Sequence, residues 1–251
     1  MEKIIIKNRK GLKIVIVVDK EENQKGLVFL MHGFLGFKEQ PILKEIGKRL
    51  KENNFTIISF DATNALGESD GKMEDGTISS YCDDLEDVIN WSKSQTFYQE
   101  SFLIVGHSLG GYCATNYAVN NNLKGIILLN PLVSGKLFNQ TNDIREVLEE
   151  CNKAKARICD SHSNQGIIEK ASFNFIKDSE KHDLLKIADK IKCKVLMISG
   201  DIDEDIPIKD QNMLFDKIGG VKERRIIKDG DHDFEGKEID VGNIVKEWAN
   251  S

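Results

Sequence analysis

Short apolar runs, rich in β-branched residues, alternate along the chain with segments in which apolar residues recur at helical spacing. The first two runs, Ile4–Ile6 and Lys13–Val18, lie close enough in sequence to form an antiparallel pair. The later runs are short and largely apolar, as expected of parallel strands covered on both faces. They predict strands at Gly26–Met31, Thr56–Phe60, Phe102–Val105, Gly125–Leu129, Val195–Ser199 and Arg224–Ile227.

Helix candidates separate these strands. One spans Pro41 to Asn53, and a second spans Thr77 to Ser92 with one apolar face. Others begin near Ser108, Ile208 and Ile239. Strand–helix alternation predicts an α/β fold, in which helices flank a mainly parallel sheet of eight strands with right-handed crossovers.

One interval breaks this rhythm. Leu132–Lys186 is about 55 residues long without a clear strand, which is longer than an ordinary connection. It is polar and carries helical patterning around Asn142–Ala156, so we predict a lid inserted between residues 1–131 and 187–251. A disordered insertion is the alternative. Its apolar side chains favour docking on the core, and four of them are predicted to line the substrate pocket: Leu137, Phe138, Phe173 and Phe175.

Composition limits the partners. The chain has 251 residues, of which 40% are hydrophobic, enough to bury one large core. The net charge of −6 argues against nucleic acid or an anionic membrane, because both select basic surfaces. No stretch approaches the ~20 apolar residues of a membrane span. The sequence carries no indication of oligomeric state.

The five cysteines are odd in number and include no C-x-x-C pair, which makes a disulfide framework or a zinc site a poor interpretation. Reduced thiols are expected. The apolar run at the start, Ile4–Ile6, is too short for a signal peptide. Together these features predict a cytoplasmic protein.

The segment Ser101–Gly111 is the most informative one. An apolar strand runs directly into Gly106-His107-Ser108-Leu109-Gly110, and a helical pattern follows, which is the context that a G-x-S-x-G nucleophile turn requires. Small residues on either side let such a turn close and hold the serine in a strained backbone conformation. The alternative is a glycine-rich helix N-terminus that binds an anion.

This segment resembles the nucleophile turn of the α/β-hydrolase family, and the resemblance extends over nearly the whole chain. It implies an α/β-hydrolase fold with Ser108 as nucleophile and no cofactor or metal. The stretch Phe60–Gly71, at the end of the fourth predicted strand, is also similar to the family's D-x-x-G-x-G-x-S-x-G pattern. It departs from that pattern at Asn64, where a glycine is usual.

A serine nucleophile needs a base within hydrogen-bond reach. His107 adjoins the serine, but consecutive side chains diverge on a tight turn, while His162 and His182 lie in the predicted lid. His232, in Asp229–Phe234, is similar to the G-x-x-H-x-F pattern that carries the family's base. A surface-loop histidine is the alternative.

The triad acid is expected in Ser199–Pro207, which resembles the family's G-x-x-D-x-x-V-P. This alignment implies Asp203, with Asp201 and Asp205 as fallbacks. The three alternate carboxylates are also reminiscent of a calcium loop. Ile206, however, stands where such a loop requires glycine.

The oxyanion of a tetrahedral intermediate needs preorganised N–H donors. One is expected to be the backbone amide of Leu109, directly after the nucleophile. His32-Gly33-Phe34-Leu35-Gly36 looks like the family's H-G-F loop and implies Phe34 as the second donor, with His32 organising the loop.

A Ser-His-Asp site implies an acyl-enzyme that is then hydrolysed, and short-chain or aryl carboxylic esters are the predicted small-molecule substrates. Small lidded carboxylesterases, including cinnamoyl (feruloyl) esterases, are the most similar in these motifs. Thioesterases, monoacylglycerol lipases and aminopeptidases share the same residues. An acyltransferase and a ligand-binding protein that has kept a hydrolase shell are further alternatives.

Overall fold

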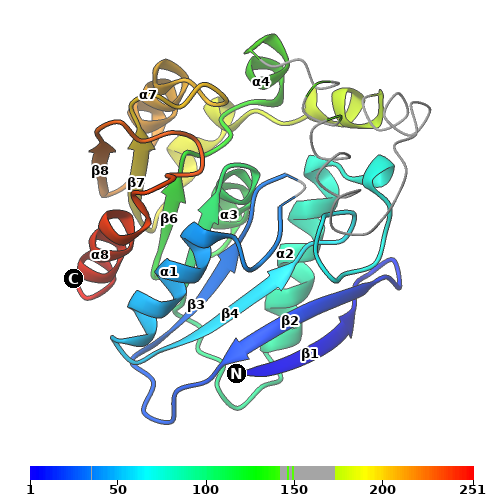
Figure 1. The fold of residues 1–251 in the computed structure, drawn as a ribbon, viewed down its shortest axis with the longest axis vertical. Coiled ribbons are helices and arrows are strands. Elements are labelled where there is room, and N and C mark those ends of the chain that lie inside the picture. Colours follow the sequence, from blue (N-terminus) through cyan, green and yellow to red (C-terminus); the bar gives the residue numbers. More distant parts are fainter. Residues whose placement is uncertain (35, 142–145, 147–148, 150–172) are drawn as a thin grey trace.

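A computed structural model gives the fold of residues 1–34, 36–141, 146, 149 and 173–251 (Figure 1). One sheet of eight strands runs through it, in the order β1-β2-β4-β3-β5-β6-β7-β8. The pairs β1–β2 and β2–β4 are antiparallel, and all the others are parallel. The strands are β1 (Glu2–Lys7), β2 (Lys13–Asp19), β3 (Gly26–Met31), β4 (Phe55–Asp61), β5 (Leu103–His107), β6 (Gly125–Leu129), β7 (Lys194–Gly200) and β8 (Lys222–Ile227).

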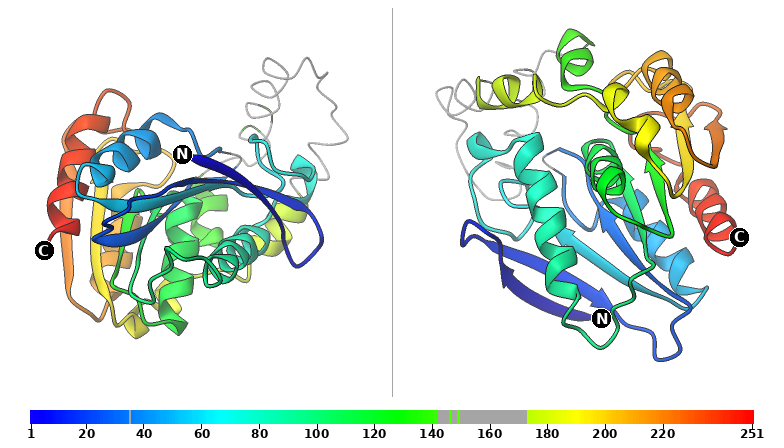
Figure 2. Two further views of the ribbon diagram at one scale, coloured as in Figure 1. Left: turned by 90° about the horizontal axis from the view of Figure 1, so that it is seen from below. Right: turned by 180° about the vertical axis from the view of Figure 1, so that it is seen from behind.

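Helices cover both faces of this sheet, so the molecule has three layers (Figures 1 and 2). Helices α1 (Pro41–Lys51) and α8 (Glu238–Ala249) lie side by side on one face. Helices α2 (Ile78–Ser92), α3 (Leu109–Asn120) and α7 (Ile208–Lys217) pack on the other. The predicted fold class, a mainly parallel eight-stranded sheet flanked by helices, is confirmed.

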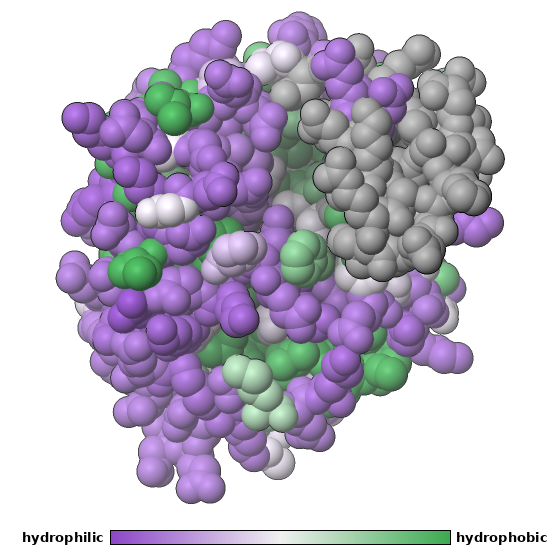
Figure 3. Space-filling view, viewed as in Figure 1, coloured by the Kyte–Doolittle hydropathy of each residue, from purple (hydrophilic) through white to green (hydrophobic). Residues whose placement is uncertain are grey.

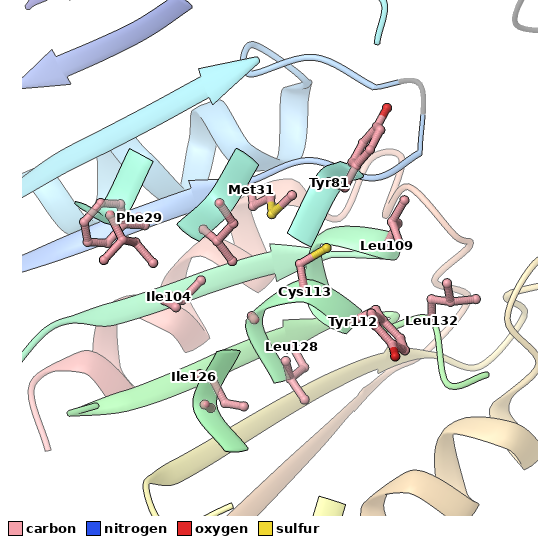
Figure 4. Close-up of a cluster of buried hydrophobic side chains, with 14 of the residues drawn as sticks. Phe29, Met31, Tyr81, Ile104, Leu109, Tyr112, Cys113, Ile126, Leu128 and Leu132 are labelled. Atoms are coloured by element: carbon pink, nitrogen blue, oxygen red, sulfur yellow. The ribbon is translucent and has the colours of Figure 1, made fainter. Parts of the chain in front are cut away.

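Strand alternation divides the core into two clusters, one on each face. In β3, Phe29 and Met31 face the α2–α3 layer, whereas Val28 and Leu30 face the α1–α8 layer. Figure 4 shows side chains of β3, β5 and β6 pointing together toward α2 and α3. Because both faces are buried, the central strands read as continuous apolar runs. The edge strand β8 stays mostly half-exposed or exposed, which accounts for its charged sequence, KERRII.

The predicted boundaries are largely confirmed. Gly26–Met31 and Gly125–Leu129 agree to the residue. The helix predicted from Thr77 begins where the Thr77 side chain accepts a hydrogen bond from the Ser80 backbone N–H, and the Ser80 hydroxyl accepts one in return. This reciprocal cap satisfies two N–H groups that a helix start leaves open.

The predicted lid leaves the sheet after β6 and returns before β7. Its two ends lie side by side, because the Leu184 N–H donates to the Val133 carbonyl at 3.0 Å and the Gly135 N–H to the His182 carbonyl at 2.9 Å. Leu132, Val133 and Leu184 are buried in the main core cluster. Within the insertion the structure describes α4 (Gly135–Thr141), a helical segment at 173–179, and two short 3-10 turns, Leu184–Lys186 and Ala188–Lys190.

The helix expected around Asn142–Ala156 lies, but for residues 146 and 149, outside the described residues, as do Cys151, Cys159 and His162. The domain boundaries at residues 132 and 186 therefore stay a prediction.

Cys82, Cys113 and Cys193 are free thiols. The described surface in Figure 3 is predominantly hydrophilic, with hydrophobic side chains scattered across it. No helix in the described ranges has the length and apolar character that crossing a membrane would require.

Candidate active site

Ser108 lies at the carboxyl end of β5, directly before α3, in a conformation that few residues adopt. Its φ is 53° and its ψ is −118°, which confirms the strained turn predicted from the motif. A Cβ on Gly106 would lie 2.2 Å from the Gly110 carbonyl oxygen, and a Cβ on Gly110 would lie 2.4 Å from the Met31 carbonyl oxygen. Both glycines are therefore required by close backbone approach.

His232 and Asp203 come together from two loops that follow neighbouring strands. The His232 Nδ1 lies 3.0 Å from Asp203 Oδ1 and 3.1 Å from Oδ2. The Asp203 carboxylate also accepts the backbone N–H groups of Asp205 at 3.0 Å and Ile206 at 2.9 Å. A carboxylate with this many donors is fixed in place and can hold an imidazole in one tautomer.

The two fallback acids are placed differently. Asp201 is exposed. Asp205 is half-exposed, and its Oδ2 lies 4.0 Å from His232 Nε2, the ring nitrogen opposite the one that meets Asp203. Geometry therefore favours Asp203 as the partner of Nδ1.

Charge around His232 sets its protonation. Burial disfavours the imidazolium, but the hydrogen bond to Asp203 and the carboxylates of Asp203, Asp205 and Asp233 outweigh burial and raise the pKa of His232. His107 shows the opposite shift, because burial and the neighbouring His232 ring lower its pKa to about 4. Of the two neighbouring histidines, only His232 is thus poised to take up a proton near neutral pH.

His232 lies beside the residue that precedes the serine, but it makes no hydrogen bond to Ser108 among the described residues. The rings of His107 and His232 have centroids 5.0 Å apart, and His107 precedes the serine directly. Among the described residues the Ser108 hydroxyl is not bonded to His232. Catalytic hydrogen bonds are often long until substrate binds. The contact between these two groups stays a prediction.

The loop after β3 passes directly over the serine. A Cβ on Gly33 would come 3.0 Å from Ser108 Cβ and 3.5 Å from its Oγ. In the described ranges, neither the Phe34 nor the Leu109 backbone N–H donates to a protein acceptor. An oxyanion would need two such donors beside the serine, and the assignment of these two N–H groups stays a prediction. Leu35 of this loop is outside the described residues.

His32 ties this loop to the sheet. It is fully buried, its Nδ1 donates to the Gly33 carbonyl at 2.7 Å, and its Nε2 accepts the Ala62 N–H at 3.0 Å. Burial lowers its pKa, so the ring stays neutral and can serve as donor and acceptor at once. Both ring nitrogens are occupied, which suits the organising role expected for His32.

A buried ion pair anchors the loop after β3, and the sequence analysis did not predict it. Lys38 Nζ and Asp61 Oδ2 are 2.8 Å apart, and the Lys38 backbone N–H donates to Asp61 Oδ1 at 2.8 Å. Asp61 ends β4, and a Cβ on Gly67 would meet its carboxylate at 2.1 Å.

Asn64, where a glycine is usual, has a φ of 63° and so takes up the left-handed turn that a glycine would.

Aromatic side chains join the loop to the insertion. The Phe34 ring lies 4.5 Å from the Phe175 ring and 6.0 Å from the Tyr81 ring, and Phe138 lies 6.0 Å from Phe175. Phe175 is 1% exposed, and Leu137 and Phe138 pack partly buried against the core. Phe173 is 64% exposed. A pocket-lining role for these four residues stays a prediction.

A polar cluster fastens the returning arm of the insertion to α2 and α3. His182 Nε2 lies 2.9 Å from Ser79 Oγ, and its Nδ1 lies 3.0 Å from the Tyr112 hydroxyl. Asp178 accepts the Ser79 hydroxyl at 2.7 Å and its backbone N–H at 2.9 Å. Asp178 Oδ2 lies 3.2 Å from the same ring nitrogen of His182, Nε2, that meets Ser79. Because Ser79 and Asp178 share one nitrogen, the imidazole cannot relay a proton from one to the other. The cluster is an anchor that the sequence did not reveal.

Curated relatives and solved structures resemble this chain. The human mitochondrial palmitoyl-protein thioesterase ABHD10 is 22% identical over 214 residues, which cover 84% of this chain and 67% of the relative. Its Bos taurus counterpart is 24% identical over 217 residues, covering 84% and 68%. The relatives carry "mitochondrial" in their names, and the cytoplasmic location of this chain stays a prediction.

Among solved structures, Est1E from Butyrivibrio proteoclasticus with ferulic acid bound has a TM-score of 0.80 at 21% identity, covering 98% of this chain and 97% of that one. Mouse ABHD10 has a TM-score of 0.70 at 18% identity, covering 99% and 100%. These likenesses show a shared fold, and they confirm the α/β-hydrolase fold expected from the motifs.

Residues 22–180 match the family described as serine aminopeptidase, S33. The match includes the loop after β3 and Ser108, and it ends before Asp203. Since it spans more than half of the chain, this protein belongs to the serine aminopeptidase, S33 family of hydrolases.

Proposed function

We propose that this protein is a serine hydrolase that cleaves carboxylic esters through an acyl-enzyme on Ser108. The observation that carries the proposal is the turn at Ser108, whose positive φ lifts the hydroxyl from the sheet edge beside Gly33. The hydrogen-bonded pair of His232 and Asp203 supports it from the neighbouring loops.

In the first half-reaction, His232 Nε2 takes the proton from Ser108 Oγ as Oγ attacks the ester carbonyl carbon. The carbonyl oxygen becomes an oxyanion, which accepts the N–H groups of Phe34 and Leu109. The imidazolium, stabilised by Asp203 on Nδ1, then protonates the leaving alcohol. Water, activated by the same base, attacks the acyl-enzyme and releases the acid.

The substrates proposed are esters with short or aryl acyl groups. The aromatic cluster of Phe34, Phe138 and Phe175 offers an apolar wall beside the oxyanion loop, and apolar walls with few polar groups are typical of ligand pockets. The solved Est1E structure carries ferulic acid, a carboxylic acid that contains an aromatic ring.

Thioester cleavage is the second candidate, because the curated relatives are named palmitoyl-protein thioesterases. The same triad and oxyanion donors would serve it, since only the leaving atom changes from oxygen to sulfur. The acyl groups of the two candidates differ, however: a palmitoyl chain needs a longer apolar channel than a feruloyl group.

The test is a matched panel on the purified protein. p-Nitrophenyl esters of increasing acyl length, methyl ferulate, and thioesters of the same acyl groups are compared by kcat/KM, with labelling by a fluorophosphonate as the measure of an activated serine. The proposal expects labelling and a preference for short or aryl oxygen esters. A preference for long-chain thioesters would favour the second candidate, and a protein that neither labels nor turns over any substrate would contradict both.

A further inference from the structure

Asn130, the residue after β6, is at the centre of a hydrogen-bond network at the carboxyl edge of the sheet. It is fully buried and has a φ of 42°. Its Nδ2 donates to the backbone carbonyls of Asp231 and His232, both at 2.9 Å. Its Oδ1 accepts the Gly200 backbone N–H at 2.8 Å and the Gln211 side chain at 3.2 Å. Both donors and both acceptor positions of the amide are thus used.

These contacts reach both remaining members of the triad. The loop that carries His232 is held through its main chain by Asn130. On the other side, Gln211 Nε2 donates to Asp203 Oδ2 at 3.3 Å and to the Ile206 carbonyl at 2.8 Å. The main chain of His232 is therefore hydrogen-bonded directly to Asn130, and the Asp203 carboxylate is linked to Asn130 through the side chain of Gln211.

The His232 carbonyl has a second donor. His107 Nε2 lies 2.8 Å from it, and His107 is the residue directly before the nucleophile. One carbonyl oxygen thus joins the base loop both to the nucleophile turn and to the end of β6. Together the two donors fix where the His232 main chain lies relative to Ser108.

We propose that Asn130 is a positioning residue for catalysis, which sets His232 against Ser108 by holding the main chain of the base loop. The inference rests on the proposed function of Ser108 and His232. A displacement of about 1 Å at a reacting group can cost about 100-fold in rate. Removing two adjacent main-chain anchors of the base would permit a displacement of that size.

The chain offers a matched control for a merely structural asparagine. Asn64 is also buried and also left-handed, with a φ of 63°, and its Oδ1 accepts the Lys72 backbone N–H at 2.9 Å. Among the described residues its side chain bonds to Thr63, Lys72 and Asp75, and to none of Ser108, Asp203 and His232. Asn64→Asp makes the same chemical change as Asn130→Asp, so it reports the cost of that change to a buried turn alone.

The experiment measures kcat, KM and the rate of fluorophosphonate labelling for both variants on the alkaline plateau of the pH profile. There, a shift in the pKa of His232 does not contribute. Asn130→Asp keeps the shape and the acceptor for Gly200 but removes both donors to the base loop. We expect kcat and the labelling rate to fall together by about 10- to 100-fold, with KM within about twofold of wild type. Asn64→Asp should keep wild-type kcat and labelling even if its melting temperature falls.

Asn130→Gly is the second variant, because glycine tolerates the left-handed φ and removes the same donors without a new charge. It should lose kcat and labelling as Asn130→Asp does. If either Asn130 variant is folded and labels at the wild-type rate, the inference is wrong while Ser108 chemistry stands. It is also overturned if neither variant folds, since Asn130 would then be a folding determinant. A wild-type protein that does not label would instead contradict the proposed function itself.

Discussion

The two halves of the candidate site are built by different means. In the nucleophile half, the turn at Ser108 is closed by backbone packing: Gly106 and Gly110 approach carbonyl oxygens, and Gly33 lies against Ser108. The loop after β3 is tied down in addition by His32 and by the ion pair of Lys38 with Asp61. The acid–base half, Asp203 with His232, also contains a close backbone approach, since a Cβ on Gly200 would lie 2.2 Å from the Gly230 carbonyl oxygen. Its two reacting residues are placed mainly by hydrogen bonds, which involve the side chains of Asn130 and Gln211 and the backbone N–H groups of Asp205 and Ile206.

This difference decides what each half tolerates. A turn closed by glycines has no room for added atoms, because the neighbouring backbone cannot move away cheaply. A loop held by amide hydrogen bonds keeps its shape when a side chain is exchanged, but loses its position when a donor is lost. Predictions for the first half therefore concern chemistry at one atom, and those for the second concern placement.

The largest effect is expected at the nucleophile. Ser108→Ala removes the attacking oxygen and should lower kcat on a p-nitrophenyl ester by about 10³ to 10⁶ while the protein stays folded. Steady-state kinetics with circular dichroism measure both. A pure, folded variant with near wild-type turnover would remove Ser108 from the mechanism and the first half from the site.

The acid–base half is tested by a set of three matched substitutions. Asp203→Asn keeps the shape of the carboxylate but favours the wrong tautomer of His232, and it should cost about 10⁴ in kcat. Asp201→Asn and Asp205→Asn should cost far less, because neither carboxylate meets Nδ1. A large loss at Asp201 or Asp205 instead would show that the acid is two residues from Asp203.

The aromatic contact between the insertion and the oxyanion loop is tested by Phe175→Ala. Its ring is buried against Phe34, so the substitution should cost about 3–5 kcal/mol of folding free energy and change the ranking of p-nitrophenyl esters by acyl length. Phe173→Ala, at a 64% exposed position, is the control and should change neither. Chemical denaturation and kcat/KM across the ester series provide the two readouts. Equal rankings for all three proteins would argue against a pocket wall at Phe175.

The smallest effect concerns pH. Because the pKa of His232 is raised and its neutral form is the base, the acid limb of kcat/KM should lie above the ordinary value of about 6.5 for histidine. Asp203→Asn removes a cause of that rise and should move the limb to lower pH, whereas Asp201→Asn should leave it in place. The ion pair of protonated His232 with Asp203 stabilises the folded protein fully below pH about 6.5, and this contribution is lost as the pH rises through the raised pKa of His232. A wild-type limb below 6.5 would contradict this electrostatic account.

Local sequence patterns predicted the fold and the nucleophile turn well. Strands such as Gly125–Leu129 are apolar runs bounded by polar residues, and the turn at Ser108 is a five-residue motif. The anchors were not predicted, because their partners are distant in sequence: Lys38 pairs with Asp61, and Asn130 with His232. A polar residue directly after a central strand, as Asn130 is, was the signal available for such an anchor.

Phe173 and Phe175 show a second limit. Both were predicted to line the pocket, yet one is exposed and the other is buried. They lie in the helical segment 173–179, where residues two apart point about 200° away from each other. The helix therefore turns the two side chains toward different surroundings, while a pocket-lining role for either of them stays a prediction.

The central claim is that Ser108 carries the acyl group, and trapping the intermediate tests it most directly. The protein is mixed with a p-nitrophenyl ester, quenched in acid within the first turnovers, and mapped by peptide mass spectrometry. We expect the mass of the acyl group on the peptide that contains Ser108, and its absence in Ser108→Ala. An acyl group on another residue, or continued turnover with no acylated peptide at any quench time, would contradict the claim.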